Sequence, residues 1–144
     1  MTAKTESVQG RRILLEPNIG RPDVVATVAQ VVQACAGHGI EVRMLEDTSS
    51  HVAPGIDVET IPDTSEAAVG CELVLVLGGD GTFLRACQYA NAADVPVLGV
   101  NLGHIGFLAE SEVEPLTGVD EQIVARDNRV VERMTVEATI MHGD

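Results

Sequence analysis

The pattern of apolar and polar positions predicts a sheet of short strands. Leu73 to Leu77 are five consecutive branched aliphatic residues, too few for a helix of their own, and Gly78 and Gly79 end the run at once. A short apolar run of this kind is typical of a strand that is buried on both faces. Similar runs predict further strands over residues 11–16, 40–45 and 97–100.

Apolar residues at three- and four-residue spacing predict two helices that lie against this sheet. The first is expected to begin with Asp23 as its N-cap and to end at the Gly-His-Gly segment 37–39, and the second is expected over residues 82–92. The positions expected to face the sheet are Val24, Val28, Val31, Val32 and Cys35 in the first helix and Leu84, Cys87, Tyr89 and Ala90 in the second. The order of strand, helix and strand predicts an α/β fold: a Rossmann-like open, mostly parallel sheet with helices on both faces.

Three further stretches complete the pattern. Residues 46–66 are rich in Asp, Ser, Thr, Pro and Gly and predict a long surface loop, in which only residues 56–61 could form an edge strand. Residues 111–127 predict a helix, with Pro115 tolerated in its first turn. Residues 130–141 alternate apolar and polar side chains, which indicates a half-buried antiparallel strand.

The composition fits a globular domain and restricts its partners. Of 144 residues, 45% are hydrophobic, which is enough apolar material for a core. Acidic residues outnumber basic ones 22 to 9, and the net charge of -13 repels nucleic acid and anionic membrane surfaces. The sequence shows no apolar run long enough to span a membrane. We therefore expect a soluble protein that binds neither nucleic acid nor membrane.

Cysteines and lysines narrow the chemistry further. Cys35, Cys71 and Cys87 have no C-x-x-C spacing and lie in apolar settings, so we expect core thiols in a reducing cytoplasm. Lys4, within the polar first ten residues, is the only lysine. A Walker-type phosphate loop, a Schiff-base lysine and a Ser-Lys dyad each need a lysine within the fold, so none of them is expected.

The glycine-rich turn after the central strand is the candidate site. Gly78, Gly79 and Gly81 surround Asp80, so a ligand could contact the backbone there, and amides at a helix start favour anions. A carboxylate in this position could accept a hydroxyl proton or hold Mg²⁺ near a phosphate. The alternative is that Asp80 only caps the following helix. Because capping does not need three neighbouring glycines, we favour the functional interpretation.

Other side chains near this turn have two interpretations each. Thr82 could contact a ligand or supply only a turn hydroxyl. Arg85, one helical turn after Gly81, could reach a phosphate or ribose, or could remain solvated. Phe83 and Phe107 each follow a glycine motif, so a base or nicotinamide ring could pack on them, although core packing is the commoner role of phenylalanine.

Two glycine-punctuated loops are expected at the same carboxyl edge of the sheet. Residues 78–82 read G-G-D-G-T, and residues 101–108 read N-L-G-H-I-G-F-L. This pair of motifs resembles the bacterial NAD kinases, within the superfamily of lipid kinases and 6-phosphofructokinases that share a G-G-D-G-T loop. The resemblance implies phosphoryl transfer from ATP, or from inorganic polyphosphate, to the 2′-hydroxyl of the NAD adenosine ribose, giving NADP. It also implies Mg²⁺ or another divalent cation as cofactor.

The resemblance assigns roles to residues of the first loop. It implies that Asp80 is the catalytic residue, which accepts the proton of the 2′-hydroxyl or polarises that group. It further implies that Gly81 contacts NAD and that Arg85 lies near the dinucleotide. The implied nucleotide-binding residues are Gly79, Asp80, Gly81, Thr82, Phe83, Arg85 and Phe107.

The sequence contains only part of the family's pattern. The family also has a motif with Asn and an acidic residue and a G-S-T-A-Y-like loop in a C-terminal β-rich domain, and neither occurs here. We therefore expect residues 10–128 to form an N-terminal α/β kinase domain and residues 129–144 to begin a truncated β-rich NAD-binding domain. On this interpretation the chain alone is inactive, and the full-length protein is a homo-oligomer. Two alternatives stay open: a lipid or sugar kinase of the same superfamily, and a non-catalytic nucleotide-binding or regulatory domain.

Overall fold

The fold is an open parallel sheet with helices packed against it. A computed structural model describes residues 10–52, 55–101 and 111–112. Its sheet has the strand order β3-β2-β1-β4-β5-β6, and every neighbouring pair is parallel. The elements in chain order are β1 (Arg11–Pro17), α2 (Pro22–Gly37), β2 (Ile40–Leu45), α3 (Glu46–Ser49), β3 (Glu59–Ile61), β4 (Leu73–Leu77), α4 (Asp80–Ala93), β5 (Val97–Asn101) and β6 (Ser111–Glu112).

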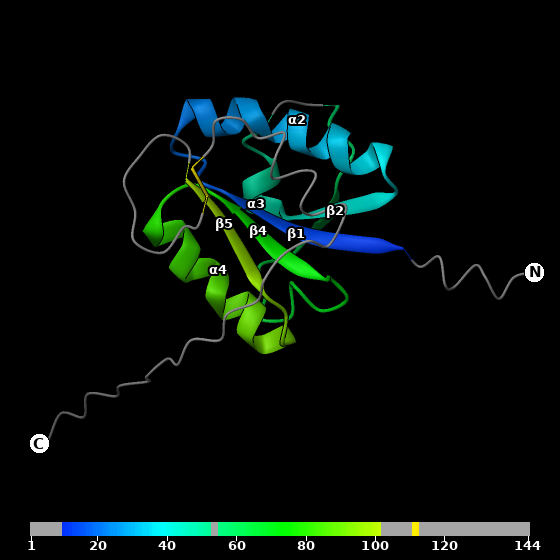
Figure 1. Ribbon diagram of the computed structural model, residues 1–144, viewed down its shortest axis with the longest axis vertical. Coiled ribbons are helices and arrows are strands. Elements are labelled where there is room, and N and C mark those ends of the chain that lie inside the picture. Colours follow the sequence, from blue (N-terminus) through cyan, green and yellow to red (C-terminus); the bar gives the residue numbers. More distant parts are fainter. Residues whose placement is uncertain (1–9, 53–54, 102–110, 113–144) are drawn as a thin grey trace, which may run out of the picture.

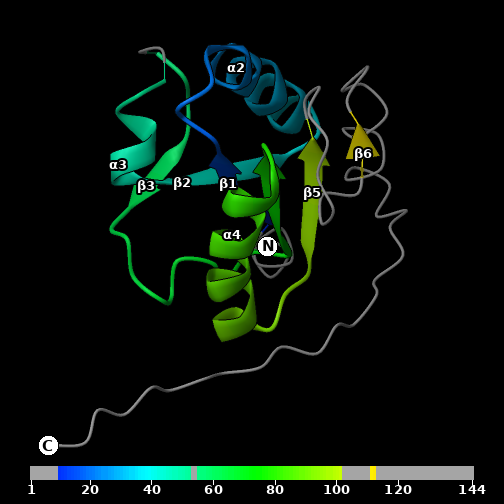
Figure 2. The ribbon, with the colours of Figure 1, turned by 90° about the vertical axis from the view of Figure 1, so that its left-hand side faces the viewer.

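Helices α2 and α4 cover opposite faces of the sheet, as the views in Figure 1 and Figure 2 show. Helix α2 connects β1 to β2, whereas α4 connects β4 to β5. Apolar residues three and four positions apart form one side of each helix, and that side is buried against the strands. The buried residues are Val24, Val28, Val31, Val32 and Cys35 in α2 and Ala86, Tyr89 and Ala90 in α4.

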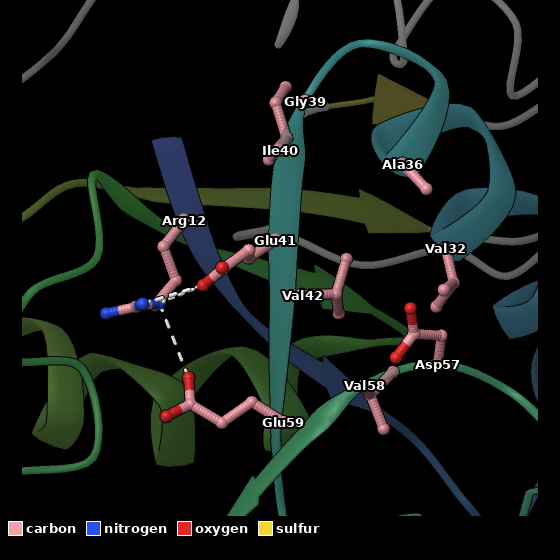
Figure 3. Close-up of a pocket in the computed structure, with 10 residues that line it drawn as sticks. All are labelled: Arg12, Val32, Ala36, Gly39, Ile40, Glu41, Val42, Asp57, Val58 and Glu59. Atoms are coloured by element: carbon pink, nitrogen blue, oxygen red, sulfur yellow. Dashed lines mark hydrogen bonds and ion pairs between the residues drawn. The ribbon is translucent and has the colours of Figure 1, made fainter. Parts of the chain in front are cut away.

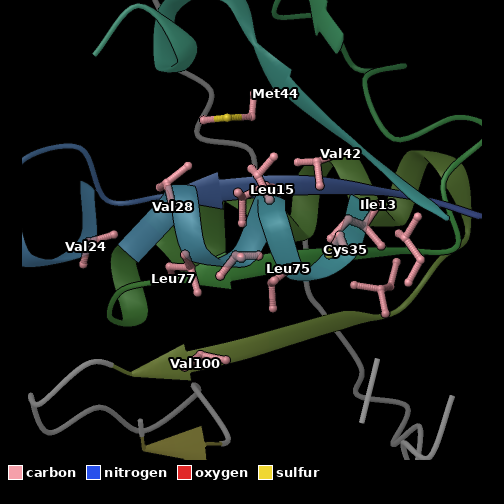
Figure 4. Close-up of a cluster of buried hydrophobic side chains, with 14 residues drawn as sticks. Ile13, Leu15, Val24, Val28, Cys35, Val42, Met44, Leu75, Leu77 and Val100 are labelled. Carbon is pink, nitrogen blue, oxygen red and sulfur yellow. The ribbon is translucent and has the colours of Figure 1, made fainter. Parts of the chain in front are cut away.

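Strand β4 contributes to the core on both faces of the sheet. All five of its residues are buried, because β1 and β5 flank it and a helix covers each face. Its three leucines belong to the cluster under α2 that Figure 4 shows. Val74 and Val76 belong to the cluster under α4. A strand in this position needs an unbroken aliphatic run, and residues 73–77 supply it.

The chain reverses its winding direction between β1 and β4. From β1 it proceeds outward through β2 to β3, then returns to place β4 on the other side of β1 and proceeds outward through β5 to β6. The register pairs Pro17 with Leu77, so the carboxyl ends of β1 and β4 lie side by side. In open α/β sheets, ligands bind in the crevice outside the strand ends at such a reversal.

The predicted α/β class and most of the predicted elements are confirmed. The strands expected over residues 11–16, 40–45, 73–77 and 97–100 correspond to β1, β2, β4 and β5. Every apolar position expected on the first helix is buried. Within the ranges that the structure describes, no helix is long and apolar enough to cross a membrane.

The start of α2 differs from the expectation. The N-cap residue is Arg21 and the helix begins at Pro22, so the prediction that Asp23 is the N-cap was wrong. Proline suits the first helical position, because its fixed φ angle fits the helix and its missing N–H group has no partner to lose there. Asp23 lies in the first turn instead, where its carboxylate pairs with the Arg21 guanidinium at 2.7 Å.

The apolar side of α4 also differs. Leu84 was expected to face the sheet, but 57% of its surface is exposed. It precedes the buried Ala86 by two residues, which places it on the far side of a helix with 3.6 residues per turn. Cys87 is only partly buried, whereas Tyr89 and Ala90 are buried as expected.

Residues 46–66 are not one long loop, as was predicted. The segment contains the short helix α3 and the edge strand β3, which pairs with β2 and confirms the last three residues of the possible strand at 56–61. The side chain of Arg43, on β2, fixes the segment that leads from β3 back to β4. Arg43 is buried and pairs with Glu59 at 3.0 Å. It also donates hydrogen bonds to the carbonyl groups of Ala67 and Val69 at 2.8 and 2.7 Å.

The helix expected over residues 111–127 is wrong at its first two residues. Ser111–Glu112 forms β6, which pairs in parallel with the end of β5. An open strand edge offers unpaired backbone groups, and pairing with them outweighs a weak helical pattern. The remainder of that helix, and the strand expected over residues 130–141, lie outside the described residues.

Two leucines provide a test of this packing. We expect Leu75→Ala to lower the free energy of unfolding by about 2 to 5 kcal/mol, because the fully buried side chain would leave a cavity in the central strand. Leu84→Ala removes the same atoms from an exposed helix position and should change stability by no more than about 0.5 kcal/mol. Urea unfolding of both variants measures the difference, and equal losses would contradict the assigned core.

Candidate functional site

The candidate site lies where β1 and β4 end side by side. The amide of Asn18, just after β1, donates to the carbonyl of Leu77 at 2.9 Å. On the other side, the amide of Gly78 donates to the carbonyl of Val100 in β5 at 2.9 Å. These two bonds hold the start of the glycine turn between its neighbouring strands. The turn therefore begins at a fixed point, directly outside the reversal of the sheet.

Gly78 is required by the fold itself. Its φ angle is +154°, a conformation that residues with a side chain rarely adopt, and it is buried. A Cβ atom at this position would lie 2.9 Å from Cβ of Asn18 and 3.4 Å from Oγ1 of Thr82. The glycine thus permits the close approach of the β1 end to the start of α4.

Gly79 and Gly81 have no such structural reason to be glycine. Neither has a φ angle in the positive region, and no described atom lies within 4 Å of a Cβ added to either residue. Gly81 is exposed in the first turn of α4. Open space where a side chain could stand leaves room for a ligand to approach the backbone.

Asp80 is the first residue of α4. The N-cap residue is Gly79, and the helix hydrogen bonds begin with the amide of Phe83 donating to the carbonyl of Gly79 at 3.1 Å. The structure therefore does not support the alternative in which Asp80 is the N-cap. The first amides of any helix lack partners within the helix and carry partial positive charge, which favours a negative group at this end. A carboxylate and a helix start that favours negative charge thus lie together at the strand ends.

Arg85 reaches from α4 to the end of β1. Its Nε atom lies 3.4 Å from Oε2 of Glu16, while 54% of the arginine side chain stays exposed. Glu16 is completely buried, and neither of its carboxylate oxygens has a hydrogen-bond partner among the described residues. Burial raises the pKa of the Glu16 carboxyl from 4.5 to about 7, against the opposing attraction of Arg85.

A second polar pair lies close to the first. The hydroxyl of Tyr89, on α4, donates to Oδ1 of Asp63 at 2.5 Å. Burial, followed by the hydrogen bond to Asp63, raises the pKa of the Tyr89 hydroxyl. The negative charge of Asp63 adds to the rise in the pKa of Glu16, so the two pairs interact electrostatically.

Of the other residues predicted for the site, one lies near the glycine turn, one packs in the core, and one lies outside the described residues. Thr82 lies in the first turn of α4, beside Gly78. Phe83 is partly buried and packs against the apolar cluster under α4, which is the core role weighed against ring stacking. Phe107 and most of the loop 101–108 lie outside the described residues. Asn101, which opens that loop, is the last residue of β5, next to the strand that carries the glycine turn.

Sequence reasoning missed Glu16 and Asn18 as parts of this site. Glu16 ends an apolar run and resembles a strand-terminal charge in solvent, yet α4 covers it. One signal was available. Once β1 and β4 are expected to be neighbours at a reversal of the winding direction, the last residues of β1 must border the glycine turn.

A hollow in the described part of the chain lies elsewhere. It has a volume of about 590 Å³ and lies beside the amino-terminal half of β2, where Val32 and Ala36 of α2 approach Val42, as Figure 3 shows. Glu41 and Glu59 pair with Arg12 at its other side. None of the predicted site residues lines it. Among the described residues, no group of three or more His, Cys, Asp or Glu side chains could hold a metal ion.

A parallel sheet that reverses at β1 and β4, with an open glycine turn and a carboxylate at the reversal, is typical of α/β domains that bind ligands outside the strand ends. The chain belongs to the ATP-NAD kinase family, because the family's sequence description, ATP-NAD kinase N-terminal domain, matches residues 24–128. Proteins named NAD kinase from Mycolicibacterium paratuberculosis and Rhodococcus erythropolis are each 46% identical to it. The matches cover 92% and 94% of this chain, but 46% and 47% of those proteins. The chain thus spans about half the length of these relatives.

The comparison with solved structures agrees on the fold. The crystal structure of yeast NADH kinase complexed with NADH superimposes with a TM-score of 0.63 and 18% sequence identity. The match covers 80% of this chain and 38% of the yeast chain. Family membership favours the NAD kinase interpretation over a lipid or sugar kinase of the same superfamily.

The two kinds of glycine can be distinguished by experiment. We expect Gly78→Ala to lower the free energy of unfolding by at least about 1 to 3 kcal/mol, because the new Cβ atom would stand 2.9 Å from that of Asn18 at a positive φ angle. Gly81→Ala, in open space within a helix, should leave stability unchanged or raise it by up to about 1 kcal/mol. Thermal or urea unfolding compares them. Equal tolerance of both changes would disprove the tight packing of Gly78.

Burial of Glu16 predicts a pH dependence of stability. Its pKa is higher in the folded protein than the ordinary 4.5, so the folded state holds more protons and this group lowers stability as pH rises from about 4.5 to about 7. Glu16→Gln cannot ionise. Between those limits, wild type should lose roughly 2 to 4 kcal/mol relative to the variant. Urea unfolding across this range measures the difference, and parallel curves would show that Glu16 is not buried as a titrating group.

Proposed function

We propose that this chain is the N-terminal part of a kinase that phosphorylates NAD. The reaction would transfer the terminal phosphoryl group of ATP, or of inorganic polyphosphate, to the 2′-hydroxyl of the adenosine ribose, giving NADP. Membership of the ATP-NAD kinase family and relatives named NAD kinase support this function. The observation that carries it is the position of Asp80, which begins α4 at the open glycine turn where the sheet reverses.

The partial match to the relatives is compatible with the proposed domain division. Residues 10–128 form the α/β domain, and residues 129–144 begin a second, β-rich domain that completes the NAD site. The chain covers 46% of the length of the Mycolicibacterium relative, which supports a site shared between two domains. We expect the chain alone to be inactive and the full-length protein to be a cytoplasmic homo-oligomer. The net charge of this chain, -13, supports small-molecule substrates rather than nucleic acid or membranes as partners.

Asp80 is proposed to act as the general base. A ribose hydroxyl is a poor nucleophile, and a carboxylate within reach can accept its proton as the oxygen attacks. A bond then forms between the 2′-oxygen and the terminal phosphorus, and the bond from that phosphorus to the bridging oxygen of the donor breaks. ADP, or a polyphosphate shortened by one unit, leaves. The proton remains on Asp80 until it passes to solvent.

The surrounding residues are proposed to bind the nucleotide. Gly79 and Gly81 lack obstructing atoms, so phosphate or ribose oxygens can approach the backbone there, and the amides at the helix start favour negative charge. The Thr82 hydroxyl lies in the same turn. Arg85 is the cationic side chain that α4 contributes near this end, and its side chain is about half exposed. Phe83 and Phe107 complete the proposed nucleotide-binding set.

A divalent cation, Mg²⁺ or a similar ion, is proposed as cofactor on family grounds. Such a cation would neutralise charge on the phosphates of the donor during transfer. Mg²⁺ commonly keeps several waters and binds mainly to substrate phosphates, so the small number of acidic side chains in the described crevice is compatible with it. We assign it no protein ligand.

Substitution of Asp80 tests the function. In the full-length protein, Asp80→Asn should lower kcat for NAD phosphorylation by about 10² to 10⁴, because the amide cannot accept the hydroxyl proton. Asp94→Asn is the matched control, since Asp94 is also an acidic residue at an end of α4 but is exposed at the carboxyl end of that helix, away from the glycine turn. Its kcat should equal that of wild type. An Asp80→Asn enzyme within threefold of wild type would eliminate Asp80 as the base.

A further inference from the structure

Glu16 is a buried acid that the proposed reaction does not use. It comes from β1, in the first half of the sheet, whereas its partner Arg85 comes from α4 in the second half. The glutamate is wholly buried and makes no hydrogen bond among the described residues. A buried carboxylate that is neither hydrogen-bonded nor tightly paired is costly, so the fold keeps it at the expense of stability.

The geometry leaves about half of the Arg85 side chain exposed. Its Nε atom lies 3.4 Å from Oε2 of Glu16, and 54% of the side chain is accessible to solvent. A guanidinium carries five N–H donors, and its Nη groups are suited to bind two oxygens of one phosphate. Helical side chains lean toward the N-terminus, so Arg85 leans over the turn that contains Gly81. A phosphate approaching the open backbone of Gly81 would therefore meet this arginine.

We propose that Glu16 and Arg85 form one anion-binding unit, in which Arg85 binds a phosphate group of the nucleotide and Glu16 takes up a proton as it does so. Glu16 is thus a positioning residue, which acts through Arg85. This inference rests on the proposed function, because it takes NAD as the ligand of the glycine turn.

The charges around Glu16 give the coupling its direction. Among the described residues, Arg85 and Tyr89 face Glu16 from α4, and Asp63 faces it from the segment after β3. On β4, the residue in register with Glu16 is the uncharged Val76. Arg85 is the only one of these that favours the ionised carboxylate. A phosphate on Arg85 offsets that positive charge and brings more negative charge near Glu16. Both effects raise the pKa of Glu16 above its resting value of about 7.

The coupling has a measurable size near neutral pH. A group with a pKa of about 7 is half protonated at that pH, so complete protonation on binding takes up about half a proton. By the same linkage, NAD should bind up to about tenfold more tightly at about pH 6 than at about pH 8. The pyrophosphate of NAD does not titrate in this range, so the proton must come to the protein.

Isothermal titration calorimetry tests this on the full-length protein. NAD is titrated at about pH 7 in two buffers that differ in ionisation enthalpy, which gives the number of protons taken up. Wild type should take up about half a proton, and Glu16→Gln should take up nearly none. Glu72→Gln is the matched control, because Glu72 also pairs with an arginine, Arg11, but at the opposite end of the β1–β4 pair. Its proton uptake should equal that of wild type.

A second variant keeps the test independent of the buried position. Arg85→Gln changes an exposed side chain, and it should both weaken NAD binding and abolish the proton uptake. Equal proton uptake by wild type and Glu16→Gln would overturn the inference and leave the proposed function intact. The same holds if Glu16→Gln changes only the melting temperature. If NAD binds to none of these proteins, the proposed function falls and the inference falls with it.

Discussion

Strand β4 and its hydrogen bonds to a strand on each side are the constraint on which the rest of the molecule depends. β1 pairs with it along five positions and β5 along four, and its side chains fill both apolar clusters. Because β1 belongs to one winding direction and β5 to the other, β4 joins the two halves of the sheet. This pairing fixes the position of the glycine turn. At the end of β4, the amide of Asn18 donates to the carbonyl of Leu77, and the amide of Gly78 donates to the carbonyl of Val100.

The three glycines of the turn differ in their surroundings. Gly78 allows the close packing of the turn on Asn18, whereas Gly79 and Gly81 leave space that no described atom fills. Packing therefore requires glycine at one position of this turn and not at two others only a few residues away. The three glycines of the G-G-D-G-T motif are therefore not explained by one common physical cause.

Much of the fold could be predicted because its strongest signals are local. The run Leu73 to Leu77 is typical of a doubly buried strand, and the glycine turn that follows it leads directly to a helix that begins at Asp80. What could not be predicted depends on contacts between residues far apart in sequence. The Arg43 side chain fixes the segment after β3 by donating hydrogen bonds to two backbone carbonyl groups. The spacing of apolar residues along the sequence gives no sign of such long-range hydrogen bonds. Glu16 is buried at the end of β1, where a side chain of α4, much later in the chain, approaches it.

The pairing of Tyr89 with Asp63 has a practical consequence. The chain has one tyrosine and no tryptophan, so its ultraviolet absorption near 280 nm and its intrinsic fluorescence arise from a single ring. That ring is buried on α4, hydrogen-bonded to a carboxylate, and electrostatically coupled to Glu16 and Arg85. The polypeptide therefore carries a built-in optical reporter next to its candidate site, which needs neither a label nor an engineered chromophore.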